Sequence, residues 1–118
     1  MSTFTNPDRE LAPERVAELM RDSGDGWQVI DVRESYEREA GHLPASRHVE
    51  LEHLASQADT IARDQPVVFY CRLGSRSAMA TQAFLAAGYD AYNLSGGISA
   101  WDAAGLELEP RDGHVADH

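Results

Sequence analysis

The chain has 118 residues, 42% of them hydrophobic, a length and composition that predict one globular domain with a single core. Its 20 Asp and Glu residues against 10 Lys and Arg residues give a formal net charge of −10, which argues against nucleic acid and anionic membranes as partners. No apolar stretch approaches the ~20 residues of a membrane span, and residues 1–10 lack the apolar segment of a secretory signal, so we expect a cytoplasmic protein.

Short apolar runs and helical patterns alternate along the first half of the chain. A predicted helix begins at Pro13, which suits the first helical position, and ends in the glycine-rich turn at residues 23–26. Residues 27–32 have the pattern of a buried strand, residues 35–40 that of a short charged helix, and residues 48–50 that of a brief strand.

The second half continues this alternation and ends in a polar tail. Its predicted elements are a helix over residues 51–62, a strand over 67–70, a helix over 78–87, a strand over 89–94 and a helix over 98–104. Strands separated by helices favour a parallel sheet covered on both faces, and therefore an α/β fold. We assign the domain to residues 1–108 and expect residues 109–118 to form a flexible tail without chemistry.

Cys71, the single cysteine, follows the predicted strand at residues 67–70 and precedes the alanine-rich helix. A cysteine usually packs as a small hydrophobe, but this one lies just past the apolar run and is followed by mostly polar residues. Backbone N–H groups at a helix start, the helix dipole, and the nearby Arg72 and Arg76 favour a thiolate. A single cysteine forms no internal disulfide, so any resolving thiol must come from another molecule.

Asp31 and Arg33 end another predicted strand. Because the carboxyl ends of parallel strands meet at one edge of a sheet, we expect them near Cys71, in a supporting role. For Asp31, pairing with a nearby arginine or capping of the following turn is the commoner arrangement, and we favour it over direct action on substrate.

The remaining histidines and Trp101 suggest structure rather than chemistry. His42 lies in a turn, where an imidazole can tie two backbone segments together, and Trp101 is expected to anchor the last helix in the core. The other histidines lack the spacing of a metal site; they are His48, His53, His114 and His118. We therefore expect neither a metal nor a cofactor.

Three segments together resemble the single-domain rhodaneses, a sulfurtransferase family: residues 29–44, 70–77 and 93–101. The similarity extends from about residue 11 to about residue 108. It implies a three-layer α/β domain with a central, mainly parallel, five-stranded sheet and helices on both faces. Residues 41–46 read Gly-His-Leu-Pro-Ala-Ser where the family usually has Gly-His-Ile-Pro-Gly-Ala, which leaves the type of the turn after Pro44 open.

The resemblance also implies a reaction. Cys71 would accept a sulfane sulfur from thiosulfate or a persulfide donor, become a persulfide, and pass the sulfur to cyanide or a thiol. The backbone amides of the following loop would surround this sulfur, as an oxyanion hole surrounds developing charge. The loop residues are Arg72, Leu73, Gly74, Ser75, Arg76 and Ser77. A tight loop at Gly74 requires a residue that tolerates positive φ, and the serines add hydroxyl donors. A sulfur-donor or sulfur-acceptor protein is a further conceivable partner.

Two alternative functions stay open. The first is a cysteine-dependent phosphatase or arsenate reductase, because relatives on this fold hold an oxyanion in a similar loop whose arginine comes six positions after the cysteine. Here Arg76 comes five positions after Cys71, and the shorter ring of amides suits a single sulfur atom better than a phosphate. The second is a sulfur carrier or binding module without turnover of its own, although inactive modules normally lack the cysteine.

Overall fold

The structure is a computed structural model that describes residues 7–117. A five-stranded sheet with the order β1-β5-β4-β2-β3 forms its centre, and all neighbouring strands pair in parallel. The strands are β1 (Glu10–Leu11), β2 (Gln28–Asp31), β3 (Arg47–His48), β4 (Val67–Tyr70) and β5 (Ala91–Leu94). All four residues of the central strand β4 are buried, as expected for an apolar run covered on both faces. The expected α/β fold is thus confirmed.

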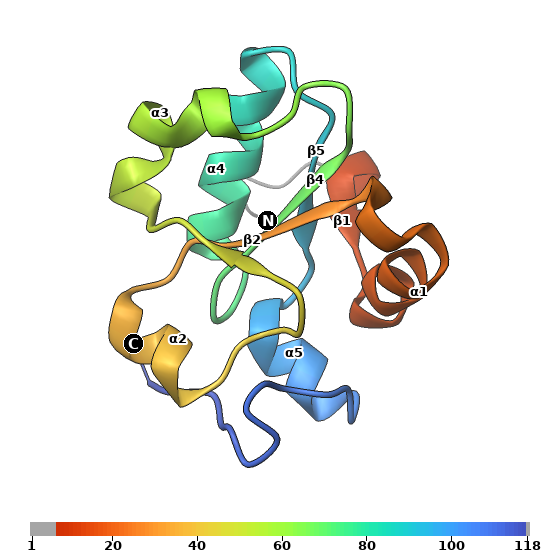
Figure 1. Ribbon diagram of the computed structural model, residues 1–118, viewed down its shortest axis with the longest axis vertical. Coiled ribbons are helices and arrows are strands. Elements are labelled where there is room, and N and C mark those ends of the chain that lie inside the picture. The colour runs from red at the N-terminus through yellow and green to blue at the C-terminus, as the bar shows by residue number, and fades with distance from the viewer. Residues whose placement is uncertain (1–6, 118) are drawn as a thin grey trace.

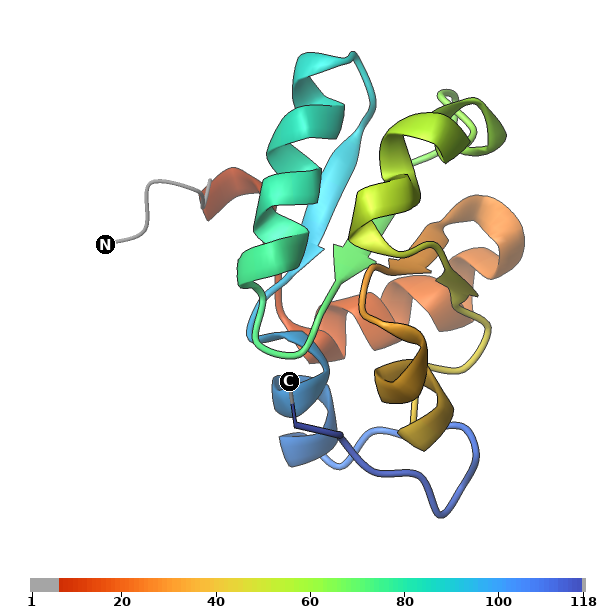
Figure 2. The same ribbon diagram turned by 90° about the vertical axis from the view of Figure 1, so that its left-hand side faces the viewer.

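Helices cover both faces of this sheet (Figures 1 and 2). The helices α1 (Pro13–Ser23) and α5 (Gly97–Ala103) pack on one face, and α3 (Leu54–Gln57) and α4 (Ser75–Ala86) pack on the other. The short helix α2 (Ser35–Ala40) lies beyond the carboxyl end of β2. Among residues 7–117, none of these helices has the length and apolar character needed to cross a membrane.

Alternate residues of β4 contribute to two hydrophobic cores, because successive side chains of a strand point to opposite faces. Phe69 faces α4, where Phe84 packs against both Phe69 and Tyr89 with ring centroids 4.9 and 4.7 Å away. Tyr70 belongs to the core on the other face. Trp101 is buried in that second core, as expected, and its Nε1 donates to the Glu107 carbonyl over 2.8 Å.

The prediction of one continuous helix over residues 51–62 is wrong, because the segment is divided into three short helical pieces. The segment consists of the 3₁₀ turn η3 (Leu51–His53), one turn of α-helix (α3) and a second 3₁₀ turn η4 (Ala58–Thr60). At each junction a hydroxyl donates to a carbonyl three residues earlier: Ser56 Oγ to His53 O (3.0 Å), and Thr60 Oγ1 to Gln57 O (2.6 Å). Such side-chain bonds compete with the helical backbone ladder and explain the interruptions.

The strands β2 and β5 lie within the expected ranges 27–32 and 89–94 but are shorter, and the two shortest strands differ most from the expectation. The brief strand expected at residues 48–50 is β3 and lies at Arg47–His48, and the sequence analysis missed β1 altogether. Each has only two residues, too few to produce a periodic pattern. The turn before β3 contains Ala45 at a φ of +59°, where the family usually has glycine. The turn therefore keeps the left-handed backbone conformation at position 45, although alanine stands there in place of glycine.

The described part of the tail runs back along α2. Glu109 pairs with His42 through two backbone hydrogen bonds of 2.8 and 2.9 Å, and His114 N donates to Ala40 O over 2.9 Å. Further on, the Tyr36 hydroxyl donates to the Asp117 carbonyl over 3.1 Å. The flexibility expected of residues 109–118 stays a prediction, as does the domain boundary at residue 108.

Candidate active site

Cys71 lies at the carboxyl edge of the sheet, directly after β4 and before the first turn of α4. The chain reverses between these elements at Gly74, which caps α4 with a φ of +107°. The positive φ expected at Gly74 is therefore confirmed. Because this conformation strains any residue with a Cβ, glycine lets the loop return to the helix start within a few residues.

The sulfur of Cys71 is enclosed by hydrogen-bond donors. Only 1% of the residue is exposed. Its Sγ accepts from the Gly74 N–H (3.1 Å), the Ser77 N–H (3.4 Å) and the Ser77 hydroxyl (3.3 Å). Gly74 and Ser77 are thus the cradle residues whose bonds to the sulfur the structure describes, whereas the Leu73 and Ser75 side chains point to solvent. Donors that converge on one sulfur stabilise it as an anion.

The amino end of α5 packs directly against the backbone of this loop. Ile98 N donates to the Cys71 carbonyl over 2.9 Å, and Ser99 N donates to the Arg72 carbonyl over 3.0 Å. The approach is so close that a Cβ at Gly97 would lie 2.4 Å from the Arg72 oxygen and 2.5 Å from the Cys71 oxygen. These bonds fix the backbone of the loop at Cys71 and Arg72 against α5. Gly97 lies inside the segment 93–101 that resembles the family, but the sequence alone does not reveal its close approach to the backbone of Cys71 and Arg72.

Asn93 and Glu10 hold the far side of the loop. The Asn93 amide donates to the Gly74 carbonyl over 3.1 Å and to the Glu10 carboxylate over 3.0 and 3.2 Å. Asn93 is buried at the end of the sheet, so these bonds fix the backbone at the residue that reverses the chain. Sequence reasoning missed both residues, because they are 83 positions apart and meet only when β1 pairs with β5.

Arg76 is bound to a buried carboxylate. Its two terminal nitrogens donate to the two oxygens of Glu37 over 2.9 and 3.0 Å, and Glu37 is fully buried in α2. Arg76 was expected from the sequence to lie near Cys71 and favour its thiolate, whereas Glu37 was not identified as its partner. The capping box between Glu34 and Glu37 was the available signal, since it places Glu37 at the start of the short helix.

Arg72 lies at the other side of the loop, near the end of the described chain. Its Nη2 is 3.4 Å from the Asp117 carboxylate, and its Nε is buried without a hydrogen-bond partner among the described residues. Arg72 and Arg76 thus flank Cys71, and each has an acidic residue beside it. A role of either arginine toward a bound anion stays a prediction.

Asp31 and Arg33 form a fully buried ion pair. Arg33 donates through Nε to Asp31 Oδ1 (2.9 Å) and through Nη2 to Asp31 Oδ2 (2.8 Å) and the Gly41 carbonyl (2.8 Å). The Tyr70 hydroxyl donates to Asp31 over 3.1 Å, and burial raises the pKa of Tyr70, which keeps it a donor. These bonds tie β2 and β4 to the turn after α2, and through them to the edge that carries Cys71. His42 contributes to the same turn, with Nδ1 3.2 Å from the Arg38 carbonyl.

The Arg76–Glu37 pair predicts a stability loss in acid. Burial raises the pKa of Glu37, but the hydrogen bonds from Arg76 and the Glu34 backbone outweigh it and hold that pKa below the usual 4.5. A carboxyl with a lowered folded-state pKa stabilises the protein above pH 4.5, and the contribution is lost as the pH falls through the folded-state value. We expect Glu37→Gln to reduce the free energy of unfolding by about 2 kcal/mol at pH 7.

Urea denaturation at pH 7 and at pH values below 4.5 measures this difference. The gap between wild type and Glu37→Gln should narrow in acid. Glu39→Gln, which removes an exposed carboxylate from the same helix, is the matched control and should change little at either pH. A gap that stays constant with pH would show that Glu37 contributes through packing instead of charge.

Comparison with known proteins agrees with the fold of this chain. Residues 12–104 match the family described as Rhodanese-like domain. The thiosulfate sulfurtransferase GlpE of Pseudomonas aeruginosa is 33% identical over 94 residues, which are 79% of this chain and 83% of that protein. A protein of Allochromatium vinosum named sulfurtransferase is 30% identical over 105 residues, or 88% and 97% of the two chains. The crystal structure of a rhodanese-related protein from Thermoplasma volcanium superposes with a TM-score of 0.78 at 25% identity, covering 85% of this chain and 96% of that one.

Proposed function

Because this chain belongs to the rhodanese-like domain family, we propose that it is a sulfurtransferase that carries sulfane sulfur on Cys71. One observation carries the proposal: three donors from Gly74 and Ser77 converge on the Cys71 sulfur at the start of α4. This arrangement suits a sulfur atom that is an anion before, during and after transfer. We further propose thiosulfate as a donor, since the relative from Pseudomonas aeruginosa is named for that substrate.

Loading would begin with attack of the Cys71 thiolate on the outer sulfur of thiosulfate. A new S–S bond forms to Cys71, the S–S bond of thiosulfate breaks, and sulfite leaves with the electron pair. The enzyme then holds Cys71 as a persulfide anion, with total charge unchanged. The helix dipole of α4 and the cradle N–H groups stabilise this anion, which has no counter-ion of its own.

In the discharge step, Cys71 is the leaving group, whereas it is the nucleophile in the loading step. Cyanide or a thiolate attacks the outer sulfur of the persulfide, the S–S bond breaks, and Cys71 leaves as a thiolate. The same donors that hold the persulfide then hold the leaving thiolate, so both half-reactions use one set of contacts. Neither step needs an oxidant, a reductant or a second cysteine of this chain.

The size of the loop favours sulfur over phosphate. Cys71 and Arg76 enclose four residues, one fewer than the phosphatase-type loop considered above, and Arg76 is bound through both terminal nitrogens to Glu37. We therefore expect turnover of thiosulfate and none of p-nitrophenyl phosphate.

Mass spectrometry of the intact protein after incubation with thiosulfate tests the proposal. We expect the mass of one added sulfur atom, located on Cys71, and its loss on addition of cyanide.

Ser77→Ala should shorten the lifetime of the persulfide by roughly tenfold, since it removes a hydroxyl donor from a buried anion. Ser75→Ala is the matched control, because Ser75 is exposed in the same loop and should leave the lifetime unchanged. No added sulfur, or hydrolysis of p-nitrophenyl phosphate by the wild type, would contradict the proposal.

A further inference from the structure

Large hydrophobic side chains gather around the Cys71 loop. Within residues 7–117, the large hydrophobic residues that are exposed are Tyr36 in α2, Leu73 in the loop and Met79 in α4, with 50%, 61% and 48% of their surface accessible. Isolated exposed hydrophobic residues are ordinary, but their concentration around one reactive group is typical of a contact surface. Tyrosine and methionine are also enriched in interfaces between proteins.

Beside these residues lies an acidic hollow, which we define by Glu34, Glu50, Leu51, Glu52 and Arg76. Its volume is about 290 Å³. The positive charge of Arg76 is already shared with the buried carboxylate of α2, so Glu50 and Glu52 give the hollow a negative character. Such a surface attracts a positively charged partner.

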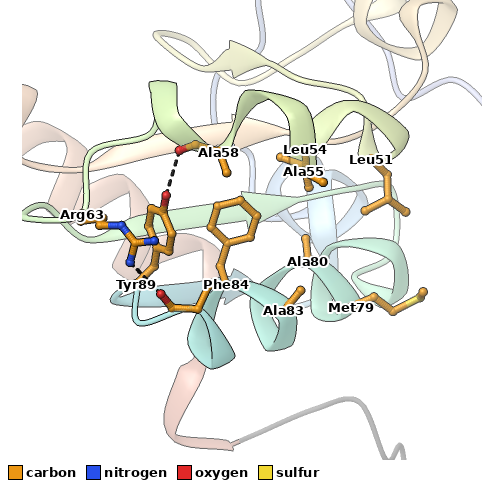
Figure 3. A pocket seen from close by; sticks show the side chains of 11 residues that line it. Leu51, Leu54, Ala55, Ala58, Arg63, Met79, Ala80, Ala83, Phe84 and Tyr89 are labelled. Atoms are coloured by element: carbon orange, nitrogen blue, oxygen red, sulfur yellow. Dashed lines mark hydrogen bonds between the residues drawn. The ribbon is translucent and has the colours of Figure 1, made fainter.

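An apolar groove lies between α3 and α4 (Figure 3). Its volume is about 440 Å³, and Leu51 lines both the groove and the hollow. Leu54 and Ala55 form one wall, Met79 and Ala83 form the other, and Phe84 lies between them (Figure 3). From Arg76 to the end of the groove at Ala87, α4 rises about 16 Å, which matches roughly five extended residues of a bound segment.

From this surface, and resting on the function proposed above, we propose that a basic protein docks here and takes the sulfur from Cys71 onto its own cysteine. An apolar segment of that protein lies in the groove, and its basic side chains face the acidic hollow. The exposed hydrophobic residues belong to three separate elements, more than one small thiol can contact at once.

The transfer step is a balanced exchange. The thiolate of the docked cysteine attacks the outer sulfur of the Cys71 persulfide and forms a new S–S bond. The existing S–S bond breaks, Cys71 leaves as a thiolate, and the partner becomes the persulfide. Docking serves to hold the attacking thiolate in line with the S–S bond to Cys71, the leaving residue, which is itself almost fully buried.

Two synthetic peptides of equal length test this inference. Each has one cysteine next to an apolar segment; one peptide has lysines at the flanking positions, and the other has glutamates there. The protein is loaded with thiosulfate and desalted, and loss of the added sulfur from Cys71 is followed by mass spectrometry at low and high salt. We expect the lysine peptide to react roughly tenfold faster or more at low salt, and the difference to shrink as salt is added.

Protein variants separate docking from the intrinsic reactivity of the peptides. The double variant Glu50→Gln with Glu52→Gln should reduce the ratio of the two rates, and Met79→Gln should slow both peptides. The double variant Glu14→Gln with Asp22→Asn removes the same charge from α1, on the opposite face of the sheet, and should keep the wild-type ratio. Loading by thiosulfate provides the reference rate in every variant.

Several results would overturn the inference. Equal rates for the two peptides, a ratio unchanged by the Glu50 and Glu52 substitutions, or faster discharge by glutathione than by the lysine peptide would each do so. Self-association that Met79→Gln abolishes would assign the face to a second copy of this chain. If Cys71 takes no sulfur from thiosulfate, the proposed function fails and the inference with it, whereas normal loading with equal transfer overturns the inference alone.

Discussion

Replacing Cys71 with serine is expected to abolish transfer of sulfur from thiosulfate to cyanide, with a loss of roughly a thousandfold or more. Serine is nearly isosteric with cysteine, but its oxygen cannot form the persulfide that both half-reactions require. The Gly74 and Ser77 donors that reach the sulfur can instead hydrogen-bond the serine hydroxyl, so the loop keeps its partners. Formation of thiocyanate measures the effect directly.

The fold of this variant is the control. Circular dichroism and the thermal midpoint of Cys71→Ser should stay close to wild type, because the substitution changes one atom at a site with polar neighbours. Incubation with thiosulfate should add no sulfur to the variant. Residual turnover in a folded Cys71→Ser protein would mean that another group carries the sulfur, and the sulfurtransferase proposal would then lose its nucleophile.

The central strand and the loop after it are the parts of the site that the sequence predicts. The apolar run at β4 can only be a buried strand or a short buried helix segment, and the polar loop and alanine-rich helix that follow decide for a strand. The position of Cys71 at the sheet edge follows from parallel topology, and the positive φ of Gly74 follows from the tightness of the loop. These are local features, determined by neighbouring residues.

The contacts that support the loop could not be predicted in the same way. Glu37 and Arg76 are 39 positions apart, and they meet because β2 and β4 are neighbours in the sheet, so that α2 lies beside the start of α4. Strand order is set by packing of the whole domain, and spacing along the chain does not specify it. The interruptions of the segment at residues 51–62 depend on the hydroxyls of Ser56 and Thr60. The spacing of hydrophobic residues, from which the helix was predicted, contains no information about such bonds.

The pairing of Arg76 with Glu37 changes how the anion is stabilised. A free guanidinium beside Cys71 would contribute a full charge, but this one shares its charge with a buried carboxylate at 2.9 and 3.0 Å. Stabilisation of the sulfur then depends more on oriented dipoles: the cradle N–H groups, the Ser77 hydroxyl and the helix α4. Dipoles work only if the loop backbone is held in place, which makes its support from α5 important.

Gly97→Ala is accordingly expected to reduce thiosulfate turnover by roughly a hundredfold, although the donors that the structure shows on the sulfur come from Gly74 and Ser77. A Cβ at this position would lie 2.4 to 2.6 Å from backbone atoms of Cys71 and Arg72. Backbone atoms cannot rotate away as a flexible side chain does, so the loop must move relative to α5. The hydrogen bonds from Ile98 and Ser99 to the loop carbonyls would lengthen, and the cradle N–H groups would turn away from the sulfur.

Gly105→Ala separates this displacement from backbone strain. Gly97 and Gly105 both have positive φ, +63° and +77°, so alanine costs each about 1 kcal/mol in conformational energy. A Cβ at Gly105, however, meets nothing within 4 Å. We therefore expect Gly105→Ala to lower the thermal midpoint slightly and leave turnover intact, while Gly97→Ala lowers both turnover and persulfide lifetime. Equal turnover in the two variants would show that the loop holds its N–H groups toward the sulfur without the close approach of α5, and that the cradle is fixed by its own turn.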